Sequence, residues 1–282
     1  MRNRIAEILC LGSLISVAQV QEPQVQQPQQ TYSHEPARDG GVREVVEGIL
    51  IPPVPHAPFT ATLATESVKY AADGAAMTFN NERRIARDAQ GRVYQERRYP
   101  VPKGGQIKST MNWIQIVDPN HLTLYNCNTE QRICDLVVYD PTNSLSALSP
   151  HKDTSGPLPQ GGGNVVWEDL GKRNIAGIDT VGTRETTTTE PGTMGNDQPF
   201  TYVSEYWHSD QFGINLLSIR TSPFFGKQTF TITEITAADP DPQLFALLTG
   251  FKVNDQRKNP RISLTPRSGA ITLRAGRVRL LS

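Results

Sequence analysis

Apolar and polar residues alternate in short runs through the middle of the chain, and this alternation predicts β-strands. The runs are rich in Val, Ile, Thr and aromatic residues, and turn sequences such as Asp73-Gly74 and Asp118-Pro119-Asn120 separate them. Such a pattern is typical of strands that bury one face. Eleven strands are predicted, at residues 59–70, 76–87, 92–99, 111–117, 122–127, 133–139, 165–170, 179–189, 200–208, 214–221 and 229–235.

The connections between the predicted strands are short, which favours antiparallel pairing. Parallel neighbours would need crossover helices, and the pattern supplies none. We therefore predict a mainly β fold, a single strongly curved antiparallel sheet with its strands in meander order. Within 214–221 the alternation changes, because Ile214 and Leu216 share one parity while Leu217 and Ile219 take the other. This change predicts either a β-bulge or a strand that is covered on both faces.

Three segments depart from the strand pattern. Residues 144–163 contain three prolines and three consecutive glycines, which is typical of a long flexible loop. A helix is predicted over residues 43–50. A second, short helical segment is predicted over residues 240–248, with Leu244 and Phe245 packed against the sheet.

Composition separates a globular part of the chain from its flanks. The 22 glycines and 21 prolines favour many short strands over long helices. Residues 19–41 are rich in Gln and Pro and poor in apolar side chains, so a disordered linker is predicted there. Residues 42–254 are long enough for one antiparallel β domain with a sizeable core. Residues 255–282 form a basic tail that is predicted to be disordered.

An apolar run near the first residue has the pattern of a secretory signal peptide. Arg2 and Arg4 precede the apolar residues 5–17, so we predict a leader over 1–18 with cleavage after Ala18. Cys10 lies inside this run and follows a leucine, where acylation sites need a small residue, so it is interpreted as part of the leader. The protein is expected to be soluble and periplasmic or secreted; the alternative is that residues 5–17 are an ordinary buried segment.

Cys127 and Cys134 are the two cysteines that follow the predicted leader. β-prone residues flank them on both sides, and the polar residues 128–132 between them are typical of a turn. The two side chains would then face each other across a hairpin and form a disulfide in an oxidising compartment. A redox pair or half of a metal site fits less well, because the Cys-x-x-Cys spacing and a histidine at ligand spacing are both missing.

Residues 205–253 resemble the C-terminal part of LolA/LolB-like proteins, which are exported bacterial domains. The hairpin Trp207-His-Ser-Asp-Gln-Phe-Gly-Ile214 is similar to the family's Trp-x-Asp-x-x-x-Gly-x-Pro turn, with Ser209 at the Asp position and Asn215 at the Pro position. The sequence Asp239-Pro-Asp-Pro-Gln-Leu-Phe245, followed by Gly250-Phe-Lys-Val253, is similar to the family's ending. The resemblance implies a half-barrel sheet and an exported protein.

A closer resemblance covers residues 59–254 and links the chain to a group of uncharacterised exported bacterial proteins. It is carried by residues 86–97, 168–177 and 194–199. This group brings no activity with it.

The LolA-like resemblance implies a concave apolar face that holds acyl chains or an extended peptide; LolA-like proteins hold lipoprotein acyl groups in this way. The candidate lining residues are Phe79, Trp113, Ile116, Trp167, Tyr206 and Leu216. The alternative is that these side chains only fill the core, as buried apolar residues usually do.

No motif in the sequence indicates an enzyme, a metal site or a cofactor. The five histidines are scattered and form neither His-x-His nor His-Glu-x-x-His. A Gly-x-Ser-x-Gly elbow, a phosphate loop and a dinucleotide fingerprint are also absent. The pairs Arg83-Arg84 and Arg97-Arg98, beside Glu82 and Glu96, are interpreted as a solvated face of mixed charge. We predict a protein without catalytic activity or cofactor.

The tail concentrates positive charge in a chain whose formal net charge is zero. Its basic residues are Arg257, Lys258, Arg261, Arg267, Arg274, Arg277 and Arg279, and its one acidic residue is Asp255. Such a tail would contact anionic lipid headgroups or cell-surface polymers. Nucleic acid is not expected, because the tail has no aromatic residue for stacking and the protein is exported. The alternative is an extension without function.

Two hypotheses of function follow for a monomeric envelope protein. In the first, the sheet binds a lipid-like or extended peptide ligand in its concave apolar face. In the second, the protein is a structural or interaction module without a small ligand, and its sheet edge or basic tail docks on an envelope protein or lipoprotein.

Overall fold

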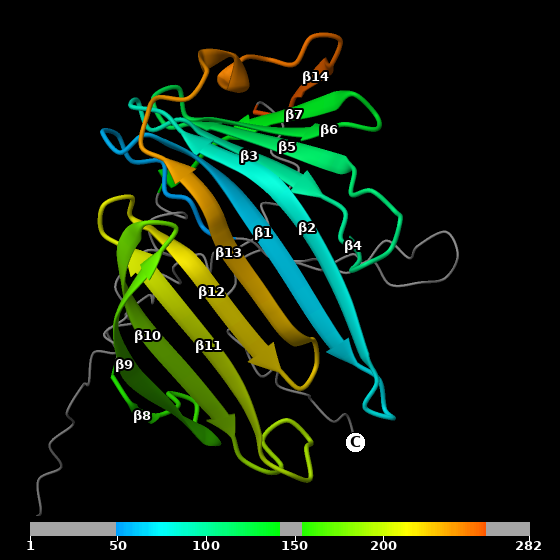
Figure 1. Cartoon of the computed structure of the whole chain (residues 1–282), viewed down its shortest axis with the longest axis vertical. Helices are drawn as coiled ribbons and strands as arrows, with labels where there is room; N and C mark the ends of the chain where they lie inside the picture. Colours follow the sequence, from blue (N-terminus) through cyan, green and yellow to red (C-terminus); the bar gives the residue numbers. More distant parts are fainter. Residues whose placement is uncertain (1–48, 142–153, 258–282) are drawn as a thin grey trace, which may run out of the picture. The chain divides into compact units, whose positions relative to one another are not determined.

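The computed structural model describes residues 49–141 and 154–257 (Figure 1). The predicted leader, the predicted linker, most of the predicted helix at 43–50 and the basic residues from Lys258 onward lie outside the described residues. Of that helix only Ile49 and Leu50 are described, and neither is helical.

All eleven predicted strands are present, and three short strands add to them. The strands are β1 (Phe59–Tyr70), β2 (Ala76–Arg87), β3 (Val93–Arg98), β4 (Val101–Pro102), β5 (Met111–Asp118), β6 (Thr123–Asn128), β7 (Ile133–Val138), β8 (Gly156–Pro157), β9 (Gly163–Ile175), β10 (Ile178–Thr189), β11 (Phe200–Ser209), β12 (Ile214–Ser222), β13 (Gly226–Thr236) and β14 (Lys252–Asp255). The added strands are β4, β8 and β14. Part of the loop predicted at 144–163 is therefore strand, since β8 and the first residue of β9 lie within it.

All fourteen strands belong to one curved sheet, which confirms the predicted fold class (Figure 1). The order along the sheet is β14-β7-β6-β5-β3-β2-β1-β13-β12-β11-β10-β9-β8, with β4 on β2. The prediction of a single meander is wrong, because β7 and β8 follow each other in sequence but are not neighbours in the sheet. The sheet consists of two meanders, β1 to β7 and β8 to β13, which the antiparallel pair β1–β13 joins.

One pair departs from the antiparallel rule. β14 lies parallel to β7, with Lys252 opposite Ile133 and Asp255 opposite Leu136. Parallel pairing needs a long connection. Here the chain between β7 and β14 includes the whole second meander, so a crossover helix is not required.

The register shifts in four antiparallel pairs of the described sheet, β1–β13, β3–β5, β9–β10 and β11–β12, and two of these shifts matter for the sequence predictions. Between β11 and β12 the register shifts after Trp207, and Leu216 is the extra residue. Of the two alternatives predicted from the mixed parity of residues 214–221, a bulge or a strand covered on both faces, the register shows the bulge. In β9 the register shifts at Gly171, which has a φ of 74° that favours glycine.

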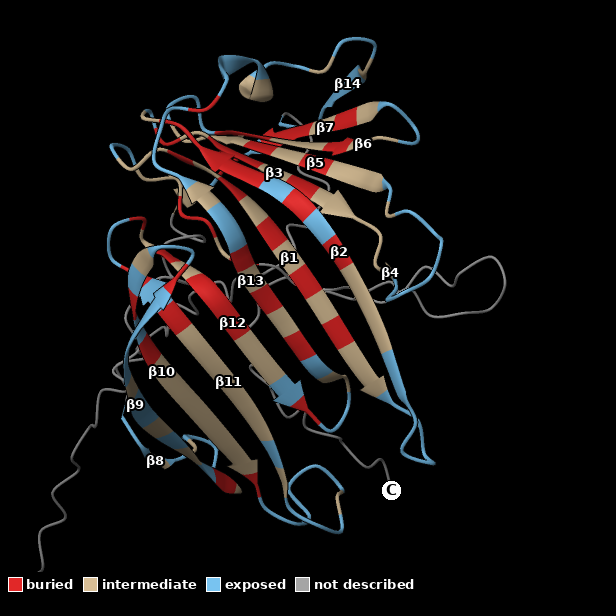
Figure 2. Ribbon diagram, viewed as in Figure 1, coloured by how far each residue is buried: buried red, intermediate tan, exposed pale blue. Residues whose placement is uncertain are grey.

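The burial pattern of β1 shows how the sheet divides into two faces (Figure 2). Phe59, Ala61, Leu63, Thr65 and Ser67 are buried, and the residues between them are half-buried. Successive side chains of a strand point to opposite faces, so one face of the sheet is the better covered at β1.

A 3-10 helix, η1 (Pro242–Phe245), lies within the helical segment predicted at 240–248. Leu244 and Phe245 pack against a cluster formed by Ala86, Tyr94, Ile114, Ile116, Cys127 and Cys134, as predicted. The Asp241 side chain caps η1 by accepting a hydrogen bond from the backbone N–H of Gln243. The short helix therefore covers the side of β3, β5, β6 and β7 on which this cluster lies.

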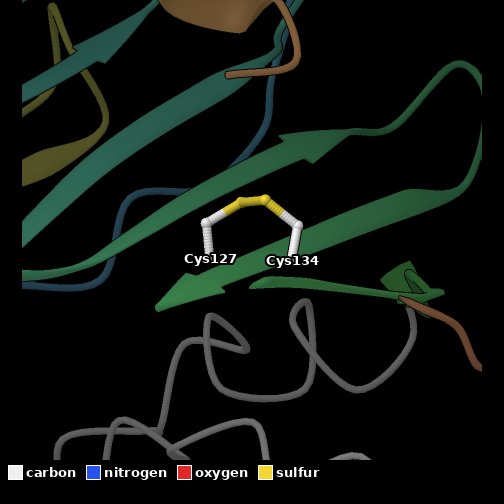
Figure 3. The surroundings of a disulfide bond; sticks show 2 residues. All are labelled: Cys127 and Cys134. Atoms are coloured by element: carbon white, nitrogen blue, oxygen red, sulfur yellow. A yellow bond between two sulfur atoms is a disulfide. The ribbon is translucent and has the colours of Figure 1, made fainter. Parts of the chain in front are cut away.

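Cys127 and Cys134 are joined by a disulfide between β6 and β7 (Figure 3). They are direct partners in the register, with a Cα–Cα distance of 3.9 Å. Both side chains are buried, at 1% and 0% exposure. The bond closes the hairpin inside the cluster that η1 covers.

Candidate ligand-binding face

Strand register assigns the side chains to the two faces of the sheet, because residues directly opposite each other in an antiparallel pair point to the same face. Arg83 of β2 is opposite Leu63 of β1, and Leu63 is opposite Ile232 of β13. Alternation from the pair Ile85–Gln95 places Arg97 of β3 on the same face. We call this side the Arg83 face, and the opposite side, which carries Tyr94 and the disulfide cluster, the Tyr94 face.

Four of the six predicted lining residues share the Arg83 face. Phe79 is opposite Ser67, Trp113 is opposite Arg97, and Tyr206 is opposite Ser218, which in turn pairs with Phe230. Trp167 of β9 is opposite Glu185 of β10, and Glu185 is opposite Ser204 of β11. Ser204 is two residues from Tyr206 on the same strand, so Trp167 lies on the Arg83 face as well. All four are half-buried. They lie on β2, β5, β11 and β9, so they mark a long face and not a single pocket.

The other two predicted residues lie elsewhere. Ile116 points to the Tyr94 face, because it is opposite Tyr94, and it is 3% exposed in the cluster with the disulfide. Leu216 is the extra residue of the β12 bulge and is completely buried. The structure therefore does not bring Ile116 together with the other candidates.

The interpretation of Arg83-Arg84 and Arg97-Arg98, with Glu82 and Glu96, as a solvated face is wrong for Arg83 and Glu96. Arg83 is 4% exposed and Glu96 is 8% exposed, whereas Glu82 and Arg84 are exposed and Arg97 and Arg98 are half-buried. The reason is that adjacent residues of a strand point to opposite faces, so Arg83 and Arg84 do not share one solvated face. On the Tyr94 face, Glu96 accepts hydrogen bonds from Arg98 Nε at 3.0 Å and from the Tyr94 hydroxyl at 3.3 Å.

Arg87 is completely buried and donates to three backbone carbonyls from two segments of the chain. Its Nε and Nη2 donate hydrogen bonds to the carbonyl of Ala57 at 2.9 and 2.8 Å. Its Nη1 donates to the carbonyl of Pro52, and its Nη2 donates a further hydrogen bond to the carbonyl of Phe212. The guanidinium lies 5.1 Å from the centre of the Phe59 ring. Burial lowers the pKa of Arg87 to about 10, so the side chain stays charged at neutral pH. Arg87 is a structural residue with every edge of its guanidinium in use.

Arg83 has a different environment on the same face. Burial, followed by the positive charge of Arg97, lowers the pKa of Arg83 to about 9. The sequence reasoning missed this residue as a candidate. The available signal was its position in β2, where it shares parity with Phe79 and Ile85 and is therefore on the same face as apolar side chains.

The aromatic residues at the beginning of β11 and in the turn between β12 and β13 form a separate group. Phe200 contacts Tyr202 and Phe224 edge to face, at ring distances of 5.6 and 5.3 Å. Tyr202 also lies 6.5 Å from Phe225. Phe224 is 67% exposed, so this group presents apolar surface at the turn between β12 and β13.

Two shallow hollows open on the Tyr94 face. One, of about 310 Å³, lies among polar side chains of β1, β2 and β13, including Glu66 and Thr231, and the Glu66–Lys103 ion pair lies beside it. The other, of about 400 Å³, lies beside η1 and is lined by Arg92, Tyr125 and Phe245. Ile116 borders this second hollow.

The described histidines do not form a reactive group with each other. His121 Nδ1 lies 2.7 Å from Asp118 Oδ2 on the surface. Burial raises the pKa of Asp118, but the hydrogen bonds from His121 and Asn120 outweigh it, so the pKa is lowered overall. Across residues 49–141 and 154–257, no group of three or more His, Cys, Asp and Glu side chains is arranged to hold a metal ion. No helix in this part of the chain is long and apolar enough to cross a membrane.

No family model matches the chain, and no curated protein matches it. Among solved structures, MucB is similar with 13% identity and a TM-score of 0.34, over 70% of this chain and 60% of the MucB chain. An uncharacterised conserved protein from Thermus thermophilus has 10% identity and a TM-score of 0.36, over 71% of this chain and 90% of that one. A Vibrio parahaemolyticus domain assigned provisionally to outer membrane lipoprotein sorting has 8% identity and a TM-score of 0.17, over 67% and 89%. At these TM-scores the similarity carries no information about ligand, partner or activity.

Proposed function

We propose that the protein is an exported cell-envelope protein that holds an apolar, lipid-like ligand against its Arg83 face. One observation carries this proposal. Phe79, Trp113, Trp167 and Tyr206 share that face through the register, and all four are half-buried and so keep accessible surface. Partly exposed aromatic side chains on one side of a curved sheet suit the binding of an alkyl chain.

Export is part of the proposal and rests on two features of the chain. The apolar residues 5–17 behind Arg2 and Arg4 have the signal-peptide pattern. The disulfide between Cys127 and Cys134 belongs to an oxidising compartment, such as the periplasm. Both features agree with a role in the envelope and say nothing about the identity of the ligand.

Native mass spectrometry with lipid extraction, on protein purified from the periplasm, tests the proposal. We expect a bound acyl species on the wild-type protein. The variant Trp113→Ala, Trp167→Ala should retain at most about a tenth of it, because two aromatic side chains of the face are removed. The matched control is Phe251→Ala, which also removes an aromatic side chain. Phe251 packs against the cluster around Tyr94 and the disulfide, on the opposite face of the sheet, so its removal should leave the bound species unchanged. A wild-type protein of bare-chain mass would contradict the ligand-binding function.

A second candidate function is an interaction module of the envelope, and the edge of the sheet favours it. β8 pairs only with Asn164 and Val165 of β9, while β9 continues to Ile175. Beyond this pairing, no described strand covers the outer edge of β9. Such an edge accepts an added strand from a partner.

The two candidates differ in what purifies with the protein. A protein partner that adds a strand to β9 should be captured without any bound lipid. Replacing Leu170 by Pro should remove the capture, because proline cannot donate a backbone hydrogen bond to an added strand. A bound lipid together with unchanged capture by the Leu170→Pro variant would contradict the interaction module.

A further inference from the structure

Arg83 has a buried guanidinium with unused hydrogen-bond donors. The side chain is 4% exposed, and its Nε and Nη2 atoms have no hydrogen-bond partner. Buried charges in proteins are normally paired, because removal from water without a partner is costly. An unpaired guanidinium at this depth therefore points to a partner that binds from outside the chain.

The two unused donors define the shape of that partner. Nε–H and Nη2–H lie on one edge of the guanidinium and point in the same direction. This edge binds the two oxygens of a carboxylate or a phosphate with parallel hydrogen bonds. In Arg87, four residues later, the same edge is taken by the carbonyl of Ala57. In Arg83 this edge is buried and has no hydrogen-bond partner.

Unpaired acceptors gather around Arg83 on the same face. Asn81 Oδ1, Gln95 Oε1 and Thr65 Oγ1 are buried and have no hydrogen-bond partner. Thr65 is opposite Asn81, and Gln95 is opposite Ile85, which places all three on strands β1, β2 and β3 around Arg83. Buried polar atoms are rarely left unsatisfied, so a cluster of them indicates a polar group that is bound there.

The local charge favours an anion. Arg97 lies on the same face and its charge acts on Arg83. Within β13, β1, β2, β3 and β5, the register places every Asp and Glu on the Tyr94 face. Arg83 keeps its proton at neutral pH, since its pKa is lowered only to about 9. These strands therefore present net positive charge on the Arg83 face.

Apolar side chains lie next to Arg83 on the same face. Leu63 is directly opposite Arg83, and Ile232 and Phe230 follow on β13; their exposures are 0%, 1% and 0%. An anion bound here would be shielded from water, which strengthens its hydrogen bonds with the guanidinium. The half-buried side chains of Phe79 and Trp113 on the same face remain accessible to an alkyl chain attached to that anion.

We propose that Arg83 is the head-group site of an amphiphilic ligand, an acyl or alkyl chain that ends in a carboxylate or a phosphate. The Nε and Nη2 donors of Arg83 bind two anionic oxygens, and Arg97 adds attraction. Asn81 and Gln95 accept hydrogen bonds from neighbouring hydroxyl or amide groups of the head. This site rests on the proposed function, because it assigns the polar end of the ligand that the aromatic side chains hold.

Calorimetry of the purified protein with three probes of equal chain length tests the site. The probes are palmitate, hexadecyl phosphate and the neutral hexadecanol. We expect the better of the two anionic probes to bind about 10- to 100-fold more tightly than hexadecanol, the range for a hydrogen-bonded charge. The preferred anion identifies the head as carboxylate or phosphate. Acetate and inorganic phosphate should bind far more weakly, because they lack the chain.

Arg83→Met should remove this preference, so that all three long-chain probes bind alike. The matched control is Arg84→Met, which makes the same change at the next residue, where the side chain is exposed on the other face. The control should keep the wild-type preference. An equal loss in both variants would overturn the site, because it would indicate an effect of net charge alone.

The possible failures are distinguishable. Equal binding of palmitate, hexadecyl phosphate and hexadecanol to the wild-type protein would overturn the head-group site and leave the proposed function standing. No binding of any long-chain probe would overturn the proposed function and the site with it. Binding of acetate or inorganic phosphate as tight as that of the long-chain probes would overturn the amphiphile and indicate a free anion.

Thermal unfolding without ligand supplies a second readout. An unpaired buried charge destabilises the fold, so Arg83→Met should unfold at the same temperature as the wild type or higher. A fall of several degrees, without a similar fall in Arg84→Met, would show that Arg83 has a structural partner within the chain, and would overturn the site. Failure of Arg83→Met to fold, while Arg84→Met folds, would overturn the site for the same reason.

Discussion

Arg83 and Arg87 lie close together in sequence and on the same face of β2, but they differ in whether their guanidinium groups have hydrogen-bond partners. Arg87 donates to the carbonyls of Pro52, Ala57 and Phe212, which come from the chain before β1 and from the turn between β11 and β12. Arg83 is also buried, yet its Nε and Nη2 have no partner. Full satisfaction indicates a structural role, whereas missing partners indicate a binding role.

Replacing Arg87 by Met should therefore destabilise the protein. The change leaves three buried carbonyl oxygens without their donor, and we expect a loss of about 3 kcal/mol or more in the free energy of unfolding. Urea unfolding measures this loss, with Arg84→Met as the control for removal of one positive charge. An Arg87→Met protein as stable as the control would show that the chain before β1 and the turn between β11 and β12 are held by other contacts.

At the scale of elements, the hairpin β6–β7 is a local structure that the chain stabilises covalently. Cys127 and Cys134 are direct partners, and the turn between the strands is short. A disulfide that closes a short loop limits the unfolded chain less than one that closes a long loop, so its contribution is moderate.

The double variant Cys127→Ser, Cys134→Ser should lose about 2 to 3 kcal/mol of unfolding free energy. Denaturant unfolding with and without a reducing agent measures the loss, and the reducing agent should affect only the wild-type protein. Equal stability of oxidised and reduced wild-type protein would contradict a stabilising role for the bond.

At the scale of the whole molecule, the pairing of β1 with β13 joins two meanders that lie far apart in sequence. It also brings Leu63 and Arg83 of the first meander beside Ile232 and Phe230 of the second. The candidate head-group site is thus a product of this long-range pair, while the basic tail is a separate feature of the chain.

Removal of residues 258–282 should weaken binding to anionic membranes. The segment contains six Lys and Arg residues and no acidic residue, and each basic residue near an anionic surface contributes about 1 kcal/mol at most. We expect at least a tenfold loss of binding to phosphatidylglycerol vesicles at low salt, measured by co-sedimentation. Neutral phosphatidylcholine vesicles serve as the control. Unchanged binding after removal of the segment would assign the tail no role at membranes.

Most strands could be predicted from the sequence because alternation of apolar and polar residues is a local property. β1 and β2 agree with the predicted bounds at every residue. β4 and β8 were missed because each has only two residues and depends on a neighbouring strand for its existence. β14 was missed because its four residues are all exposed and show no alternation.

By itself, the sequence determined the positions of eleven of the fourteen described strands, the change of alternation in β12 and the facing of Cys127 and Cys134, since each depends on residues close together in the chain. The tertiary structure alone decided that β1 pairs with β13, that Ile116 points away from the other candidates, and that Arg83 is buried. These outcomes depend on which distant strands become neighbours and which face they cover. A single residue's charge or size does not specify that, so an arginine assigned to solvent became the centre of the candidate site.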